Sequence, residues 1–199
     1  LIESFTEDGT IAYLQDLEDK IISGADAPEM VFDVFSKLDK YKFSKIANDR
    51  LRTIQGGDFM FLVLLMRWVY PAVKDLCHNH PRFFLVFDMH GFAERVVEGF
   101  SKMYTLGMDA TGFDRGVPAA LTTFVIDNLA ARSGCPVNMI AHLAMTAAFG
   151  FLQLPDGELL SRFGGNPSGI FLTSIFNCAF NDLMHLEVYL GLYGPTLFD

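Results

Sequence analysis

Two aspartates near the middle of the chain have the residue type and spacing for metal-assisted phosphoryl chemistry. Asp109 ends the short β-prone segment Met103–Asp109, which we expect to be a core strand, and Asp114 follows a glycine-containing bend. Carboxylate oxygens are the ligands that Mg²⁺ prefers. Phosphoryl transfer needs such carboxylates to position a triphosphate and to stabilise the charge that develops on it. Aspartates at this spacing also occur as turn or capping residues, so the pair alone does not decide the function.

A second candidate site is the glycine-rich loop over 165–169, together with the helix expected after it. Ser168-Gly169 end the loop at the expected helix N-terminus, where free backbone N–H groups favour contacts with phosphate or sugar groups. Thr173 and Asn177 follow four positions apart and therefore share one helix face. A capped helix with incidental polar residues is the alternative, but this ordered pattern is more specific than the aspartate pair.

The charge of the chain is distributed unevenly, which indicates a local anion-binding segment. The 199 residues carry a formal net charge of −9, yet the stretch 37–52 holds six basic side chains and two acids. A basic stretch inside an acidic chain suits a local anion site better than a general nucleic-acid-binding surface, and a solvated charged face is the alternative. Arginine forks suit bidentate phosphate contacts. The candidates are Arg50 and Arg52, with Lys37 and Lys45 upstream.

These candidates must be positioned by a mostly helical chain. Apolar periodicity and helix-ending residues predict helices over 10–23, 58–78, 90–101, 118–133, about 137–148 and 170 to about 190. The helix over 118–133 has the clearest ends, because Pro118 stands at its first turn and Gly134 lies just past its end.

A few strands complete the expected architecture. Pro155-Asp156-Gly157 separates two short apolar segments and predicts a hairpin between 149–154 and 158–163. The basic stretch, closed by Gly56-Gly57, suits an exposed extended segment or a hairpin. Many helices with few strands predict an α+β fold.

In this order along the chain, the three candidate segments resemble motifs F, A and B of viral RNA-dependent RNA polymerases. The likeness is greatest to positive-strand, picornavirus-like enzymes and covers roughly residues 35–190. It implies that Asp109 binds the catalytic metals, Mg²⁺ or Mn²⁺. It further implies that Asp114 and Asn177, with Thr173 nearby, recognise the ribose 2′-OH of the incoming nucleotide.

The resemblance also assigns the remaining candidates. Ser168-Gly169 match the mobile loop that senses the template and primer, and Arg52 matches the arginine that contacts the triphosphate. Arg50, Lys45 and Lys37 would line the nucleotide entry channel. The implied fold is the helix-rich fingers and partial palm of a right-hand polymerase. Residues 1–102 would be a fingers portion with motif F, and 103–199 a partial palm with motifs A and B and a helical fingers insertion at about 135–165.

The chain departs from the family pattern in one respect. It contains no Gly-Asp-Asp of motif C, and Gly56-Gly57-Asp58 lies upstream of motif A. We therefore expect motif C, motif D and the thumb beyond Asp199. The 199 residues by themselves are expected to bind nucleotide poorly and to catalyse nothing.

The resemblance also implies the partners and location. RNA template, RNA primer, ribonucleoside triphosphates and other viral replication proteins are the expected partners.

Three widely separated cysteines suggest neither a disulfide framework nor a metal site, and fit a reducing cytosolic setting. No apolar run reaches the ~20 residues that span a bilayer. Association with host membranes in a replication complex is implied by the resemblance alone.

Two other functions are weighed against this one. A reverse transcriptase usually has an aromatic steric gate where Asp114 stands, so Asp114 favours ribonucleotides. A noncatalytic helical domain would use the basic stretch only to bind an acidic partner. This noncatalytic alternative predicts that Asp109, Asn177 and Arg52 lie far apart in space, whereas a polymerase requires them to converge on one cleft.

Overall fold

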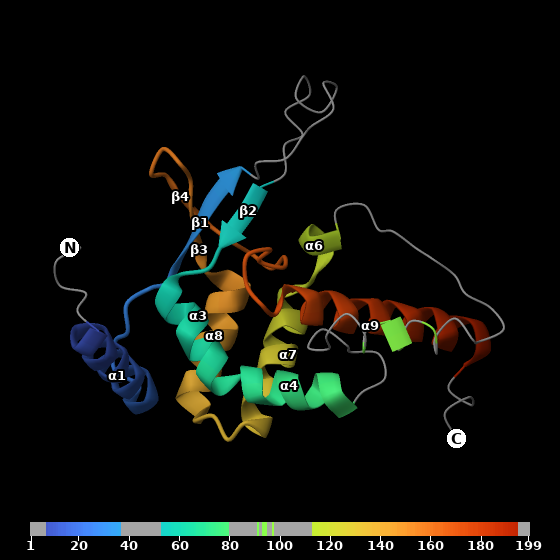
Figure 1. Ribbon diagram of the computed structural model, residues 1–199. Helices are drawn as coiled ribbons and strands as arrows, with labels where there is room; N and C mark the ends of the chain where they lie inside the picture. The colour runs from blue at the N-terminus through green and yellow to red at the C-terminus, as the bar shows by residue number, and fades with distance from the viewer. Residues whose placement is uncertain are drawn as a thin grey trace.

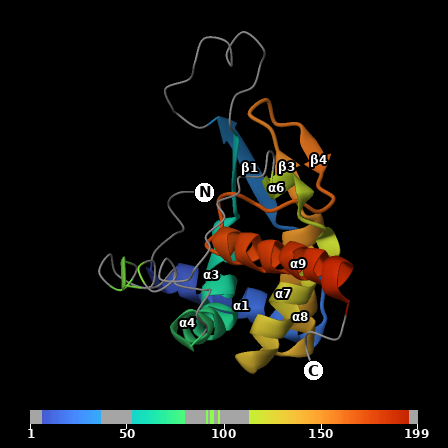
Figure 2. The ribbon, with the colours of Figure 1, turned by 90° about the vertical axis from the view of Figure 1, so that its right-hand side faces the viewer.

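The computed structural model describes residues 7–36, 53–79 and 113–194, together with residues 91, 93, 94 and 97. Its helices are α1 Glu7–Ser23, α3 Phe59–Trp68, α4 Tyr70–Asn79, α6 Phe113–Gly116, α7 Ala119–Arg132, α8 Val137–Phe149 and α9 Thr173–Tyr193. Its strands are β1 Val31–Ser36, β2 Thr53–Gly56, β3 Phe151–Gln153 and β4 Leu159–Ser161. The sheet lies at one end of the molecule and most of the helices lie at the other, as the two views in Figure 1 and Figure 2 agree. This arrangement confirms the expected α+β class.

The sheet joins segments that are far apart in the chain. Its order is β2-β1-β3-β4. β1 and β2 are antiparallel, with Ser36 opposite Thr53, so the described residues on either side of the basic stretch pair as the arms of a hairpin. β3 and β4 form the second predicted hairpin, with Gly157 at a φ of 89° in its turn. β1 also pairs in parallel with β3, a contact that the sequence did not predict.

The hydrophobic core lies between the sheet and the helices. The ring of Phe32 on β1 is fully buried and meets the ring of Phe61 on α3 edge to face, with centroids 5.5 Å apart. The Phe32 ring also packs against Gly150, where a Cβ would lie 2.9 Å from the ring. α7 and α8 add a further buried layer, which includes Ile126 and Met139. The sheet is therefore anchored to the helices through β1.

The single helix predicted over 58–78 is two helices in the structure, and this prediction was wrong in that respect. α3 ends at Trp68, and α4 begins at Tyr70. Pro71 in the first turn of α4 explains the break, because a proline has no N–H to donate and its ring clashes with the carbonyl four residues earlier. Asp58 caps α3, since its Oδ1 accepts hydrogen bonds from the N–H groups of Met60 and Phe61 at 2.8 Å and 3.1 Å.

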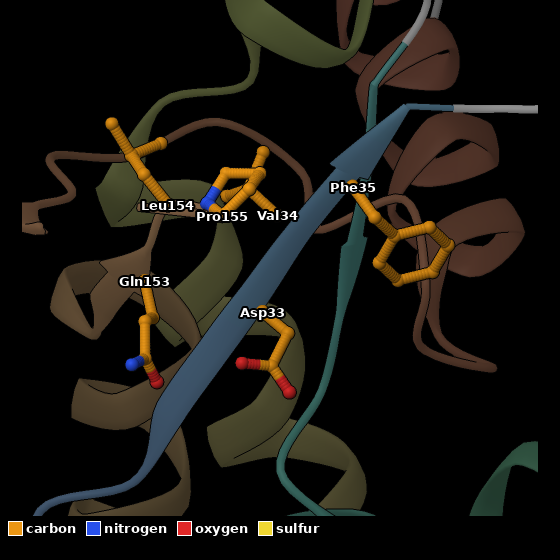
Figure 3. Close-up of a pocket in the computed structure, with 6 residues that line it drawn as sticks. All are labelled: Asp33, Val34, Phe35, Gln153, Leu154 and Pro155. Atoms are coloured by element: carbon orange, nitrogen blue, oxygen red, sulfur yellow. The ribbon is translucent and has the colours of Figure 1, made fainter. Parts of the chain in front are cut away.

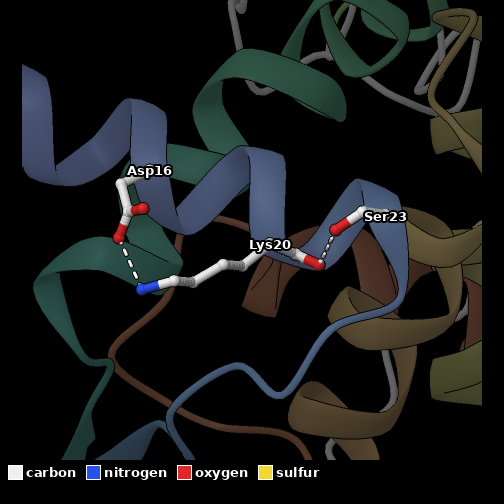
Figure 4. Close-up of polar contacts among 3 residues, drawn as sticks. All are labelled: Asp16, Lys20 and Ser23. Carbon is white, nitrogen blue, oxygen red and sulfur yellow. Dashed lines mark hydrogen bonds and ion pairs between the residues drawn. The ribbon is translucent and has the colours of Figure 1, made fainter.

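α1 begins three residues before the predicted start at residue 10 and ends at Ser23 as expected. On its exposed face Lys20 Nζ lies 2.6 Å from Asp16 Oδ2, and the Ser23 hydroxyl donates to the Lys20 carbonyl at 3.0 Å (Figure 4). The Asp16 carboxylate raises the pKa of Lys20, but an exposed pair of this kind adds little stability. The buried side of the helix is held by Glu18, which accepts from Trp68 Nε1 at 2.5 Å.

The other predicted elements agree closely with the structure where it describes them. α7, α8 and α9 match the helices expected at 118–133, 137–148 and 170–190 to within about three residues. Pro118 is the N-cap of α7 rather than a first-turn residue, and Gly134 follows its end with φ 71°. The strand Met103–Asp109 lies outside the described residues, as does most of the helix expected over 90–101. No helix in the described part of the chain is long and apolar enough to cross a membrane.

Candidate functional site

The structure brings Asp114 and Asn177 into direct contact. Asn177 Nδ2 donates to Asp114 Oδ1 at 3.1 Å, although 63 positions separate the two residues in the chain. Asn166, between them in sequence, donates from its Nδ2 to Asn177 Oδ1 at 2.8 Å and lies 3.5 Å from Asp114 Oδ1. We call these three residues the amide–carboxylate network. Asp114 and Asn177 are half-buried, whereas Asn166 is buried. Solvent therefore reaches the network at Asp114 and Asn177 and not at Asn166.

Backbone hydrogen bonds hold the two halves of this network together. The short helix α6 carries Asp114. The backbone carbonyl of Asp114 accepts from the Asn166 N–H at 2.7 Å. The Gly165 N–H donates to the Val117 carbonyl at 2.9 Å. Gly164 and Gly165 both adopt positive φ, 73° and 74°, which residues with a Cβ rarely tolerate. The two glycines therefore let the loop turn tightly against α6.

Thr173 begins α9 and closes the other side of the loop. Its hydroxyl lies 2.6 Å from the Pro167 carbonyl and 2.7 Å from the Ile170 carbonyl. Asn166 Nδ2 meets the Thr173 carbonyl at 2.8 Å and the Asn177 amide one turn later. Thr173 and Asn177 are four positions apart on α9 and therefore lie on one face of the helix.

The Ser168-Gly169 pair is bound to β2 rather than to the start of α9. The Gly169 N–H donates to the Gln55 carbonyl at 3.0 Å, and the Gln55 N–H donates to the Ser168 hydroxyl oxygen at 3.2 Å. A Cβ at position 169 would lie 2.4 Å from the Gln55 carbonyl oxygen, so only glycine fits here. The expectation that both N–H groups lie free at a helix N-terminus was therefore wrong for Gly169, and α9 begins four residues later.

Arg162 connects the glycine-rich loop to the end of α8. Its guanidinium is buried, donates to the carbonyls of Thr146 at 3.1 Å and of Ala147 at the end of α8, and lies 3.5 Å from the Gly165 carbonyl. It also stacks over the Phe32 ring, 4.7 Å from the centroid. Burial lowers the pKa of Arg162 to about 10, so the group stays charged at neutral pH. A cation at a helix C-terminus complements the helix dipole.

Five of the predicted site residues cannot be placed relative to this network. Asp109 lies outside the described residues, as do the four basic candidates of the stretch 37–52, namely Lys37, Lys45, Arg50 and Arg52. β2, which follows the basic stretch, pairs with the Ser168-Gly169 loop through a bridge between Gly56 and Gly169. The chain leaving the basic stretch therefore runs next to the candidate site.

The described donor set fits a divalent cation only in part. Asp114 offers hard carboxylate oxygens, the ligand type that Mg²⁺ takes, but its Oδ1 already accepts from Asn177. Within residues 7–36, 53–79 and 113–194, no group of three or more His, Cys, Asp or Glu side chains could hold a metal ion. The magnesium site expected at Asp109 stays a prediction.

An open pocket lies apart from this network, between β1 and β3 (Figure 3). Its volume is about 360 Å³, and it is lined by Asp33, Val34, Phe35, Gln153, Leu154 and Pro155. None of these residues was a sequence candidate, and none belongs to the amide–carboxylate network.

Sequence reasoning missed three residues that shape the site, namely Gln55, Arg162 and Asn166. Gln55 acts through its backbone, so no side-chain pattern could identify it. Arg162 belongs to the segment 158–163, and no neighbouring residue type distinguishes it from an ordinary surface cation. Of the three, Asn166 alone could have been identified from the sequence, because it lies inside the glycine-rich loop next to Pro167.

Comparison with known proteins decides the family. The model of the family described as "Viral RNA-dependent RNA polymerase" matches residues 3–192, nearly the whole chain. The chain belongs to this family.

Relatives of this viral RNA-dependent RNA polymerase segment include two viral polyproteins. It is 24% identical over 205 residues to the genome polyprotein of Salivirus A, and 23% identical over 198 residues to that of Human klassevirus 1. Each match covers 96% of this chain and 8% of the polyprotein. These matches confirm the expected likeness to picornavirus-like polymerases.

A solved structure, the Sicinivirus 3Dpol RNA dependent RNA polymerase, resembles the fold with a TM-score of 0.64 at 17% identity. The match covers 82% of this chain and 37% of that polymerase. The fold predicted by resemblance, a part of a right-hand polymerase, is therefore confirmed. The segment spans well under half the length of that polymerase.

Proposed function

We propose that the complete protein containing this segment copies RNA from an RNA template. In the reaction the 3′-OH of a primer attacks the α-phosphate of a ribonucleoside triphosphate, a P–O bond forms to the primer oxygen, and pyrophosphate leaves. The contact between Asp114 and Asn177 carries the proposal for this chain, because it joins the two segments that we assign to motifs A and B. Two neighbouring side chains, one accepting and one donating, suit recognition of a hydroxyl group that does both.

The remaining assignments follow from the same proposal. Asp114 accepts from the ribose 2′-OH and Asn177 donates to it, while the Ser168-Gly169 loop senses the template and primer. Lys37, Lys45, Arg50 and Arg52 contact the triphosphate or line its entry channel. Asp109 would hold Mg²⁺ or Mn²⁺, which stabilises the charge on the reacting phosphate when bound.

We assign residues 1–102 to the fingers and 103–199 to a partial palm, with a fingers insertion at about 135–165. The 199 residues contain no Gly-Asp-Asp, so we propose that synthesis requires parts of the polymerase outside this segment. RNA template and primer, ribonucleoside triphosphates and other viral replication proteins are the proposed partners. The proposed location is the host cytoplasm, in membrane-associated replication complexes.

A reverse-transcriptase-like activity is the second candidate among polymerases. Asp114 argues against it, because a carboxylate that binds the 2′-OH favours ribonucleotides, whereas an aromatic gate at this position would exclude them. A noncatalytic interaction domain is disfavoured by the family match over residues 3–192.

The experiment is primer extension on an RNA template with the complete polymerase. We expect Asp109→Asn to abolish synthesis, because the neutral amide loses the charge that a metal ligand needs. Asp127→Asn is the matched control, since Asp127 is exposed on α7, and it should leave the rate unchanged. Synthesis at the wild-type rate by Asp109→Asn would contradict the proposed role of Asp109.

A further inference from the structure

Asn166 is the buried member of the amide–carboxylate network. The residue is only 4% exposed, and one atom of its side chain, Nδ2, meets three acceptors. These are Asn177 Oδ1 at 2.8 Å, the Thr173 carbonyl at 2.8 Å and Asp114 Oδ1 at 3.5 Å. Asn166 Oδ1, by contrast, is buried without a hydrogen-bond partner among the described residues. The side chain is therefore used as a donor and not as an acceptor.

The chemistry of the neighbours fixes which way each amide points. The Asp114 carboxylate and the Thr173 carbonyl have no hydrogen to donate, so Asn166 must turn Nδ2 toward them. Asn177 must then present Oδ1 to Asn166 and Nδ2 to Asp114. The opposite orientation of Asn177 would place its oxygen 3.1 Å from Asp114 Oδ1, where two acceptors repel each other.

This orientation matters for sugar selection. An amide nitrogen carries two hydrogens, and the contact with Asp114 occupies one hydrogen of Asn177 Nδ2. The second hydrogen is left to donate to a 2′-OH, whose own hydrogen is accepted by Asp114. Without Asn166, nothing else in the network donates to Asn177 Oδ1, so the amide is held only by its hydrogen bond to Asp114, the same carboxylate that must accept from the 2′-OH.

We propose that Asn166 is a positioning residue that holds the Asn177 amide in its donating orientation and thereby sets the preference for ribonucleotides over deoxyribonucleotides. The proposal rests on the proposed polymerase function and adds a residue to its sugar-recognition site. The unpartnered Oδ1 supports it, because the buried side chain is used only for the hydrogens of its Nδ2.

The test uses the complete polymerase and compares kcat/KM for single-nucleotide extension with ATP and with 2′-deoxy-ATP. We expect Asn166→Leu to lower the ratio of the two values roughly tenfold, mainly by reducing kcat/KM for ATP, while the variant stays folded at the assay temperature. Asn166→Asp is the second variant, because a carboxylate keeps the shape but has no hydrogen to donate. It should lower the ratio as well.

Asn138→Leu is the matched control. It removes an asparagine whose Nδ2 donates to the Ile22 carbonyl at 2.9 Å, far from the network in the chain, and should leave the ratio unchanged. A folded Asn166 variant with the wild-type ratio would overturn the proposal. Loss of folding in both Asn166 variants would do so too, because it would make the residue structural.

Asp114→Ala is measured in parallel to separate this inference from the proposed function. If Asp114→Ala lowers the ratio and the Asn166 variants do not, only the positioning role fails. If Asp114→Ala also leaves the ratio unchanged, the sugar-recognition site itself is wrong.

Discussion

Asp114 and Asn177 share a hydrogen bond of 3.1 Å between two helices, α6 and α9, that begin 60 positions apart in the chain. The contact is side chain to side chain and partly accessible. A ligand can therefore reach the pair without breaking any backbone hydrogen bond.

The first prediction concerns this pair. We expect Asp114→Ala to reduce the preference for ribo- over deoxyribonucleotides by roughly tenfold to a hundredfold, because a charge-assisted hydrogen bond to the 2′-OH is lost. Asn177→Ala should act in the same direction. The double variant should lose less than the two losses combined, since both act on one hydroxyl. Steady-state incorporation of ATP and 2′-deoxy-ATP measures all three, and unchanged sugar selectivity in Asp114→Ala would contradict its role.

The second prediction concerns Gly169. A Cβ at this position would meet the Gln55 carbonyl oxygen at 2.4 Å and Gly56 Cα at 2.9 Å, both backbone atoms that cannot move aside cheaply. We expect Gly169→Ala to lower the free energy of unfolding by about 1–3 kcal/mol and to slow RNA synthesis strongly. Urea unfolding and primer extension measure the two effects.

Gly191→Ala is the control for that substitution. Gly191 lies near the end of α9 with nothing within 4 Å of its added Cβ. Alanine there should raise the free energy of unfolding by up to about 1 kcal/mol. A Gly169→Ala variant as stable and active as the wild type would show that the contact between β2 and the loop is dispensable.

The third prediction concerns Arg162. Replacing it with Met removes charge-assisted hydrogen bonds to the end of α8 and to the loop. We expect the free energy of unfolding to fall by about 2 kcal/mol. Arg162→Lys should not restore it, because an ammonium group cannot reach several carbonyls in the fork geometry of a guanidinium. Arg132→Met, an exposed cation on α7, should change stability by less than about 0.5 kcal/mol. Equal stabilities of the two methionine variants by urea titration would refute this role.

The fourth prediction is a pH dependence at His142 on α8. Burial lowers the pKa of His142 from its usual 6.5, and Nε2 has no hydrogen-bond partner among the described residues. Below pH 6.5 the unfolded chain therefore binds a proton that the folded protein does not, so folding stability falls as the pH falls toward the folded pKa. His142→Leu should lose less stability over that window, with a difference in slope of at most about 1.4 kcal/mol per pH unit. Parallel slopes for the two proteins between pH 7 and pH 5 would contradict this.

Much of the architecture was predictable because it depends on local signals. Pro118 and Gly134 mark the ends of α7, and Pro155-Asp156-Gly157 marks the turn between β3 and β4. β1 was missed, since its six residues, VFDVFS, do not alternate between apolar and polar types, and its parallel partner β3 lies over 100 positions away. The break between α3 and α4 was visible at Pro71, but a proline near a helix start is compatible with one helix or two.

The sequence by itself determined most of the described helices, the hairpin at 151–161, the order of the three candidate segments and the identity of the residue types available for chemistry. Each of these depends on neighbours a few positions apart. Only the tertiary structure decided that Asn166 faces Asn177, that Gln55 holds the Ser168-Gly169 loop, and that Arg162 lies under that loop. Those contacts join segments whose relative placement follows from packing of the whole core, and a side chain's hydrogen-bond partner is set by that placement and not by its spacing in the chain.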